Sequence, residues 1–277
     1  MSMDRRKFVK AVGLAAAGFA SVSPVRSLAK ELSKESKECC EECQDGCVKI
    51  RRPAHPPSKA TRWAMVLDLR ICRTHPDCND CIKACHTTHN VPDYKDTDDE
   101  IKWIWKEHFS HSFPEADHQF MPERVKHGDA LLLCNHCNNP PCVRVCPTQA
   151  TWKREKDGLV MMDWHRCIGC RYCIAACPYG SRSFNYREPR NYFEENGIKV
   201  QPDFPTRTRG VVEKCTFCED RLARGEWPSC VLACKYNALT FGDLDNPEDP
   251  VRKVLEKEFT IRRKPGLGTQ PEVYYIL

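Results

Sequence analysis

Short apolar runs alternate with turns and cysteine-rich stretches along residues 61–277. WAMVLDLRIC (63–72) and GLVMMDWHRC (158–167) each have the apolar content of a buried strand that leads into a cysteine loop. ATWKREKDGLVMMD predicts a hairpin that turns at Asp157 and Gly158, and NALTFGD (237–243) predicts another strand. Strand, cysteine loop, short helix and strand recur, which predicts an α+β fold built on an internal repeat.

The C-terminal part has a different pattern. DPVRKVLEKEF (249–259) has the spacing of a short amphipathic helix, and PEVYYIL (271–277) is typical of a final strand or an extended arm.

Two long connections carry no cysteine, residues 86–133 and 185–212. Long insertions on a rigid scaffold often serve binding, so we expect partner surfaces there. The first insertion holds several histidines whose spacing fits no tight metal or haem motif, and we expect surface and packing roles for them. These are His108, His111, His118 and His127.

Residues 1–29 are typical of a targeting segment. Arg5 and Arg6 precede Phe8, a mild apolar run over 11–20 and a small-residue cleavage pattern at 27–29, which together predict a twin-arginine export signal. The alternatives are a chance arginine pair before a core helix and retention as a weak membrane anchor. A membrane span is disfavoured because the run is short and rich in Ala and Gly. Since this route carries folded proteins, a cofactor can be inserted before export to the outer side of the membrane.

Composition changes what can hold the fold together. The chain has 277 residues, among them 20 cysteines and 20 prolines, and a mean hydropathy of −0.59. We therefore expect no single large apolar core, and expect bound inorganic groups to hold the short elements together.

Charge argues against nucleic acid as a partner. The formal charge is +5, and residues 1–29 hold five basic and one acidic side chains, so the remainder carries only +1. Each [4Fe–4S] core with four thiolates would add a charge of roughly −2, which makes a loaded protein acidic. No basic stripe interleaved with aromatic residues is present in the sequence.

The clearest chemical motif is HRCIGCRYCIAACPYG. Its cysteines, Cys167, Cys170, Cys173 and Cys177, follow C-x2-C-x2-C-x3-C-P, the bacterial ferredoxin pattern, in which the fourth cysteine binds the neighbouring cluster. Gly169 lets the backbone approach the cluster sulfurs closely. A zinc site is disfavoured because zinc usually takes two C-x2-C pairs that lie further apart.

Three further groups share the C-x3-C ending. They are Cys134, Cys137, Cys142 and Cys146; Cys215, Cys218, Cys230 and Cys234; and Cys72, Cys78, Cys81 and Cys85. Four complete sets of four predict four [4Fe–4S] clusters, with no iron left open to a substrate. No Ser/His/Asp signature or phosphate-binding glycine loop stands out, so we expect electron transfer and no catalytic residue.

The motifs CIGCRYCIAACPYG, NPPCVRVCPT, KCTFCEDRL and LGTQPEVYYIL carry a family resemblance over residues 61–277. The chain resembles the four-cluster iron–sulfur subunits of membrane-bound redox complexes of the dimethyl-sulfoxide-reductase and NrfC-like type. Within that group, a subunit with its own twin-arginine signal is most similar to the DsrO (HmeA) type of the DsrMKJOP, or Hdr-like menaquinol oxidoreductase, complex associated with dissimilatory sulfite reduction.

The resemblance implies two bacterial-ferredoxin-like modules, each with two [4Fe–4S] clusters, with insertions and extended arms. The first and last cysteine groups would build one module and the middle two groups the other. Crossing of the fourth cysteines then implies four ligand sets. These are Cys72, Cys78, Cys81 and Cys234; Cys215, Cys218, Cys230 and Cys85; Cys134, Cys137, Cys142 and Cys177; and Cys167, Cys170, Cys173 and Cys146.

The implied domain order is a signal peptide over 1–29, a cysteine-rich arm over 30–60, the double ferredoxin-like domain over 61–246, and a C-terminal helix and tail over 247–277. The implied partners are an NrfD-like membrane subunit that handles menaquinol and a c-type cytochrome on the outer side. The chain would attach to the membrane through the first of these. The alternatives are the electron-transfer subunit of a molybdopterin enzyme, such as tetrathionate or polysulfide reductase, and a zinc- or disulfide-stapled structural protein.

One departure from the family pattern concerns the last cysteine group. Lys235 replaces the usual proline after Cys234, and His86 follows Cys85. Lys235 is either a solvated lysine or a cation that raises the potential of a nearby cluster by favouring its reduced state.

A fifth cysteine group, CCEECQDGC, lies outside the resemblance. It holds Cys39, Cys40, Cys43 and Cys47 among acidic residues, which disfavours a further anionic cluster. We expect disulfides or free thiols in a docking arm. The alternatives are that this group binds a metal, either as a fifth cluster or as an ion shared with a partner, or that it has no role.

Overall fold

The structure is a computed structural model, and it describes residues 60–277. The predicted signal peptide 1–29 and almost all of the arm 30–60 lie outside the described residues, and so do the uncertain ligands Cys39, Cys40, Cys43 and Cys47. The described residues all belong to one compact unit, which includes the C-terminal residues 247–277.

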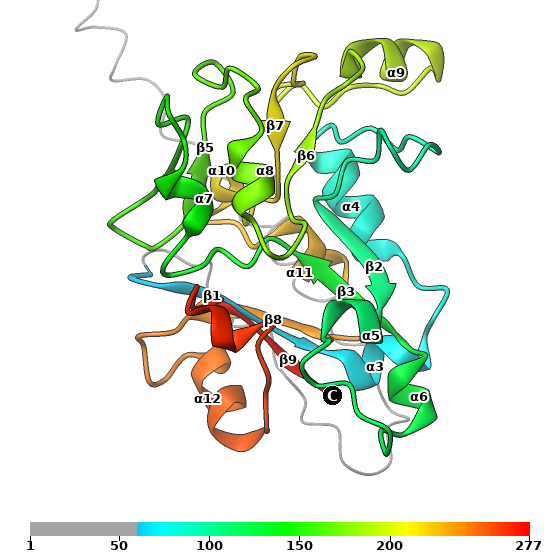
Figure 1. The fold of residues 1–277 in the computed structure, drawn as a ribbon, viewed down its shortest axis with the longest axis vertical. Helices are drawn as coiled ribbons and strands as arrows, with labels where there is room; N and C mark the ends of the chain where they lie inside the picture. Colours follow the sequence, from blue (N-terminus) through cyan, green and yellow to red (C-terminus); the bar gives the residue numbers. More distant parts are fainter. Residues whose placement is uncertain (1–59) are drawn as a thin grey trace, which may run out of the picture. The chain divides into compact units, whose positions relative to one another are not determined.

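A three-stranded sheet joins the two ends of the described chain (Figure 1). Its central strand is β1 (Trp63–Asp68), every residue of which is buried. Strand β8 (Leu239–Asp243) pairs with β1 antiparallel, and β9 (Val273–Ile276) pairs with it parallel on the other side. Helix α12 (Pro250–Lys257) contacts β1 and β8.

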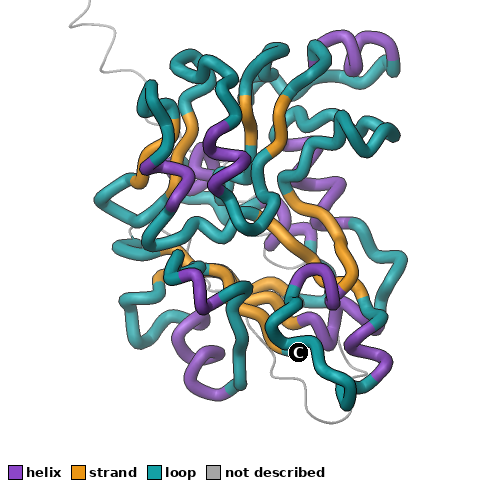
Figure 2. The backbone as a smooth tube through the Cα atoms, in the orientation of Figure 1, coloured by secondary structure: helices purple, strands orange, loops and turns teal. Residues whose placement is uncertain are grey.

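Three hairpins complete the sheet structure. Strand β2 (Ile104–His108) pairs with β3 (Asp129–Leu133), β4 (Thr151–Lys153) with β5 (Val160–Met162), and β6 (Ser183–Phe184) with β7 (Val212–Glu213), all antiparallel. Figure 2 shows how loops connect these short strands and helices.

Short helices follow most cysteine stretches. Those near cysteines are α3 (Leu69–Thr74), α4 (Asp80–Thr88), α7 (Pro141–Arg144), α8 (Tyr172–Ala176), α10 (Glu219–Ala223) and α11 (Ser229–Ala233). The others are α5 (Phe109–Ser112), α6 (Glu123–Lys126), α9 (Pro189–Glu195) and the 3₁₀ helix η2 (Pro265–Leu267). Helix α4 packs on α11, and α7 packs on α8, so the first cysteine group meets the last and the second meets the third.

The predicted elements agree with the structure in type more than in their bounds. The hairpin near Asp157, the strand within 237–243 and the helix within 249–259 are confirmed, and 271–277 holds a final strand. The strand predicted over 63–72 is wrong at its end. Asp68 accepts a hydrogen bond from the backbone N–H of Arg70 at 3.0 Å and caps α3, so Cys72 lies on a helix.

The expectation that the chain lacks a large apolar core is also wrong. Among the described residues, one cluster of buried apolar side chains runs from β1 through the β2–β3 hairpin to β8 and β9. Its centre includes Trp103, Phe217 and Tyr275, each 1% exposed or less. Low mean hydropathy hid this core because the exposed residues are strongly polar.

The second insertion is not purely a surface segment either. Phe204 and Arg207 near its end are buried, and Phe204 packs edge-on against Trp103 of the first insertion. The two predicted partner segments therefore pack against each other through buried side chains.

Candidate iron–sulfur cluster sites

The structure gathers the sixteen predicted ligands around four cavities, four cysteines to each. Cavity A is lined by Cys72, Cys78, Cys81 and Cys234, and cavity B by Cys85, Cys215, Cys218 and Cys230. Cavity C is lined by Cys134, Cys137, Cys142 and Cys177, and cavity D by Cys146, Cys167, Cys170 and Cys173. These are the four sets that follow from crossing the fourth cysteine of each group.

Helix geometry explains the crossing in the first module. Cys81 and Cys85 lie four residues apart on α4, which is about one helical turn along its axis. Cys81 reaches cavity A, whereas Cys85 reaches cavity B. Helix α11 packs against α4, and its cysteines divide in the reverse order along the chain. Cys230 on α11 lines cavity B, and Cys234 at its end lines cavity A.

The second module is built in the same way around α7 and α8. Cys142 on α7 lines cavity C, and Cys146 beyond it lines cavity D. Cys173 on α8 lines cavity D, and Cys177 at its end lines cavity C. Each pair of helices therefore shares its cysteines between two neighbouring cavities.

Backbone N–H groups point at several of the sulfurs. The Cys234 Sγ accepts from Ala238 at 3.2 Å, the Cys215 Sγ from Phe217 at 3.4 Å, and the Cys167 Sγ from the N–H of Val212 at 3.5 Å. Such donors favour thiolate over thiol and are typical of cluster sites.

The structure shows a further reason for glycine at position 169. Its φ is +68°, and a Cβ at this position would lie 2.2 Å from the carbonyl oxygen of Gly210. Glycine is needed because the backbone of the second insertion passes so close to the cysteine loop of cavity D.

Burial shifts the thiols away from the state that binds metal. Burial, followed by repulsion from neighbouring cysteines, raises the pKa of Cys72 and of Cys81 to about 12. The same causes raise the pKa of Cys215 to about 12 and that of Cys85 well above its ordinary value. Four thiolates are therefore stable in one cavity only around a positive core, which an iron–sulfur cluster supplies.

The cysteines surround cavities and do not converge on a point. Within residues 60–277, no three His, Cys, Asp or Glu side chains are grouped so as to hold a single metal ion. Four sulfurs around a cavity fit a four-iron core, in which each corner iron takes one thiolate.

The cavities follow one another in a row. Helices α4 and α11 link A to B. Burial raises the pKa of Cys215, and the charge of the nearby Cys134 of cavity C raises it further. Cys142 of cavity C acts in the same way on Cys173 of cavity D. The order along the row is therefore A, B, C, D.

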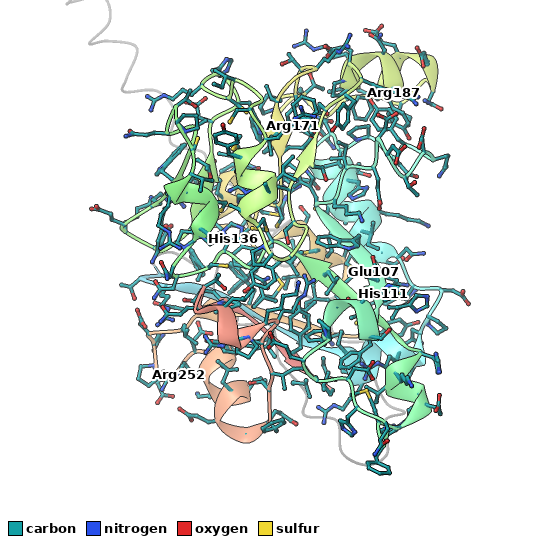
Figure 3. The ribbon with its side chains drawn as sticks, viewed as in Figure 1. Glu107, His111, His136, Arg171, Arg187 and Arg252 are labelled. Atoms are coloured by element: carbon teal, nitrogen blue, oxygen red, sulfur yellow. The ribbon has the colours of Figure 1, made fainter. Side chains whose placement is uncertain are left out.

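His136, which the sequence motifs did not single out, hydrogen-bonds Cys215, which lines cavity B, and Val160, which lines cavity C (labelled in Figure 3). Its Nδ1 accepts the N–H of Val160 at 3.1 Å, so its Nε2 carries the proton and donates to the Cys215 carbonyl at 3.0 Å. The ring stacks on Phe217 at 3.9 Å. Burial, followed by the charge of Lys214, holds the pKa of His136 well below its usual range, so the ring is neutral.

Arg182, a buried cation between cavities C and D, was not predicted from the sequence either. It lines cavity C and hydrogen-bonds the Cys142 Sγ at 3.1 Å. Its only signal in the sequence is a basic residue soon after the CPYG motif.

The two ends of the row are open, whereas cavity B is closed. All four cysteines of cavity B are buried, but Cys72 and Cys78 of cavity A are partly exposed, and Cys170 of cavity D is exposed. Cavity A is part of a larger hollow of ≈ 940 Å³. The first insertion lines this hollow with basic and imidazole side chains, Lys106, His108, His118, Arg124 and His127.

The surroundings of cavity D are more apolar. Ile168 is 67% exposed and Tyr172 is 63% exposed. Arg171, at the start of α8, lies 5.3 Å from the ring of Phe184 (Figure 3).

Lys235 lies on the surface near cavity A. Its side chain is 57% exposed, and its Nζ lies 3.1 Å from the Asp80 Oδ2. Of the two interpretations of Lys235, the structure favours the solvated one, because Asp80 and water both weaken its field at the cavity.

No helix within residues 60–277 has the length and apolar content needed to cross a bilayer.

Comparisons with known proteins agree with this set of sites. Two models of the 4Fe–4S dicluster domain match the chain, one over residues 130–190 and the other over residues 166–238.

Three relatives match most of the chain. It is 37% identical to the "Hdr-like menaquinol oxidoreductase iron-sulfur subunit 1" of Archaeoglobus fulgidus, over 99% of this chain and 97% of the relative. It is 36% identical to the "Menaquinone reductase, iron-sulfur cluster-binding subunit" of Nitratidesulfovibrio vulgaris, over 78% and 88%. It is 31% identical to a tetrathionate reductase subunit of Salmonella typhimurium, over 100% and 89%. The first and third alignments extend into residues 1–60, which the resemblance drawn from the motifs did not include.

Proposed function

This protein belongs to the family of electron-transfer iron–sulfur subunits of menaquinol oxidoreductase and related reductase complexes, and from that premise we propose that it holds one [4Fe–4S] cluster in each of cavities A to D and relays single electrons along them. Membership of this family confirms the resemblance found in the sequence.

The observation that carries the proposal is the division of sixteen cysteines into four sets of four around cavities that stand in a row. When bound, each cluster takes up and releases one electron. The chain supplies the thiolates, donates backbone hydrogen bonds to their sulfurs and keeps water from cavity B. The exposed cysteines at A and D leave both ends of the row accessible to partners.

The partners proposed are an NrfD-like membrane subunit that handles menaquinol and a c-type cytochrome. The name of the Archaeoglobus relative supports a menaquinol oxidoreductase complex. We place the chain on the outer side of the membrane, exported by the twin-arginine route and attached through the membrane subunit. The motif around Arg5 and Arg6 supports export. A role in sulfur metabolism follows from the resemblance to the DsrO type.

A second candidate is the electron-transfer subunit of a molybdopterin oxidoreductase. The similarity to the tetrathionate reductase subunit of Salmonella typhimurium and to a polysulfide reductase component of Wolinella succinogenes supports it. A large molybdopterin protein that co-purifies would favour this candidate, whereas a multihaem cytochrome would favour the first.

The test is purification from native membranes, with iron and sulfide analysis and identification of the co-purifying subunits. About sixteen irons per chain and four one-electron signals on reduction are expected from four cubanes. About twenty irons would place a fifth cluster on Cys39, Cys40, Cys43 and Cys47. A colourless protein that contains zinc or only disulfides would overturn the proposal.

A further inference from the structure

Arg182 is a buried cation whose hydrogen bonds point to the row of cavities. It precedes β6, and the whole residue is only 4% exposed. Its Nη2 donates to the Cys142 Sγ at 3.1 Å and to the Thr151 Oγ1 at 2.9 Å. Thr151 can accept this bond because its own hydroxyl donates to the carbonyl of Met161 at 2.7 Å.

No carboxylate among residues 60–277 forms an ion pair or hydrogen bond with Arg182; its third contact is the Met162 Sδ, at 3.7 Å from Nη1. Arg207, which is also buried, has Glu213 as a partner at 2.7 Å. A guanidinium stays charged at any ordinary pH, and a buried charge is costly unless an opposite charge faces it.

The charges that face Arg182 belong to the candidate cluster ligands. Burial alone would lower the pKa of Arg182, yet Cys142, Cys173 and Cys134 together keep it above its ordinary value. Cys142 and Cys134 line cavity C, whereas Cys173 lines cavity D. The counter-charge of Arg182 is therefore shared between two neighbouring sites.

We propose that Arg182 is a positioning residue for electron transfer, which raises the reduction potentials of the clusters in cavities C and D, with the larger effect in C. The inference rests on the proposed function. Reduction adds one electron and one negative charge to a site without making or breaking a bond. A nearby buried cation stabilises the more negative state, and a hydrogen bond to the ligand sulfur acts in the same direction.

A purely structural role is the competing explanation, since Arg182 also ties β6 to β4 through Thr151. Charge separates the two explanations. Arg182→Lys keeps the charge but loses the fork of donors, whereas Arg182→Gln keeps a donor and loses the charge. If packing alone matters, both variants disturb the site to a similar extent.

The experiment is a dithionite titration of the intact, cluster-loaded protein followed by EPR, with iron counted in every sample. In Arg182→Gln, two of the four one-electron steps should move to lower potential, one of them by at least tenfold in its equilibrium constant, or about 59 mV. The other two steps belong to cavities A and B and should stay in place. Arg182→Lys should shift every step by less than tenfold.

Lys235→Ala is the matched control, because it removes a cation that is exposed and already paired with Asp80. All four steps should stay in place in this variant. Four unchanged steps in Arg182→Gln with full iron content would overturn the inference, and so would equal shifts in the Gln and Lys variants. If Arg182→Gln loses iron, the test rests on Arg182→Lys. A fall in the reduction potential of any step by tenfold or more in its equilibrium constant, about 59 mV, in Arg182→Lys would then overturn the inference. Fewer than four steps in the unmodified protein would count against the proposed function itself.

Discussion

At the scale of single residues, the last cysteine of each run lines a different cavity from the other three cysteines of that run. Cys177 ends the run that begins at Cys167, but it lines cavity C with Cys134 instead of cavity D. The ferredoxin pattern assigns Cys177 to a neighbouring cluster, the family resemblance implies which one, and the structure places it with residues of the preceding run.

Iron counts in double variants test this grouping. Cys177→Ala and Cys134→Ala should each cost the cluster of cavity C, so the double variant should lose no more iron than either single variant. Cys177→Ala combined with Cys167→Ala should lose the clusters of both C and D, so the two deficits should add. Additive losses in the first pair, or a shared loss in the second, would contradict the crossed arrangement.

At Gly169, a left-handed φ coincides with a close backbone contact to Gly210. Gly169→Ala should lower thermal stability and deplete cavity D of iron. A left-handed φ costs an alanine about 1–2 kcal/mol, and the clash with the Gly210 carbonyl adds to that cost. Gly197→Ala is the control, because its φ is +62° but no atom lies within 4 Å of the new Cβ. Equal melting temperatures of the two variants would show that the close approach is unimportant.

At the scale of elements, the two insertions meet at a buried ion pair between Arg207 and Glu213. Glu213 on β7 accepts from Arg207 at 2.7 Å and from the indole N–H of Trp103 at 2.7 Å, and both partners of the ion pair are fully buried. Arg207 also donates to the carbonyl of Asn90 at 2.7 Å. Residues of both insertions, Arg207 of the second and Trp103 and Asn90 of the first, therefore share one buried polar network.

Glu213→Gln should destabilise the fold by about 3–5 kcal/mol, because it leaves the Arg207 charge buried without a counter-charge. Chemical denaturation measures this loss. Glu256→Gln is the matched control on α12, where an exposed pair with Arg252 at 3.6 Å contributes about 0.5 kcal/mol or less. A loss in Glu213→Gln as small as that of the control would contradict a structural role for the buried pair.

The elements also show where prediction from sequence succeeds. β1 and β5 could be predicted because each lies in an apolar run, and α12 because Asp249 caps an amphipathic pattern. The end of β1 could not, since Asp68 caps α3 through a local hydrogen bond that competes with the strand.

The candidate site could be predicted as far as its chemistry depends on spacing. Fifteen of the sixteen cysteines lie in C-x-x-C or C-x3-C patterns, and Cys72 precedes the first of these. Which groups share a module depends on contacts between elements that are distant in sequence, such as α4 with α11. His136 was missed because its role depends on burial between cavities B and C, and Arg182 because its role depends on burial between cavities C and D; neither shows a ligand spacing.

At the scale of the whole described unit, the last strand holds the first in place. Val273 and Tyr275 on β9 are fully buried beside β1. Removal of residues 271–277 should expose an edge of β1 and open the wall of cavity A, which Leu277 lines.

We expect the truncated protein to lose iron and to associate, which iron analysis and gel filtration would detect. Tyr275→Phe serves as the control, since the buried Tyr275 hydroxyl has no hydrogen-bond partner in the structure and its removal should cost little. A truncated protein that stays monomeric with full iron content would show that β9 is dispensable.

The division of the cysteines among the cavities also sets the order in which the sites can be completed during biosynthesis. Cavities C and D have all their cysteines once residue 177 has been made, whereas B waits for residue 230 and A for residue 234. The ribosome makes the N-terminal part first, so Cys72 to Cys85 emerge before the other ligands. Their partners belong to the last group, Cys215 to Cys234. Until residues 230 and 234 have been made, these early thiols have no complete set of partners to form a cluster site.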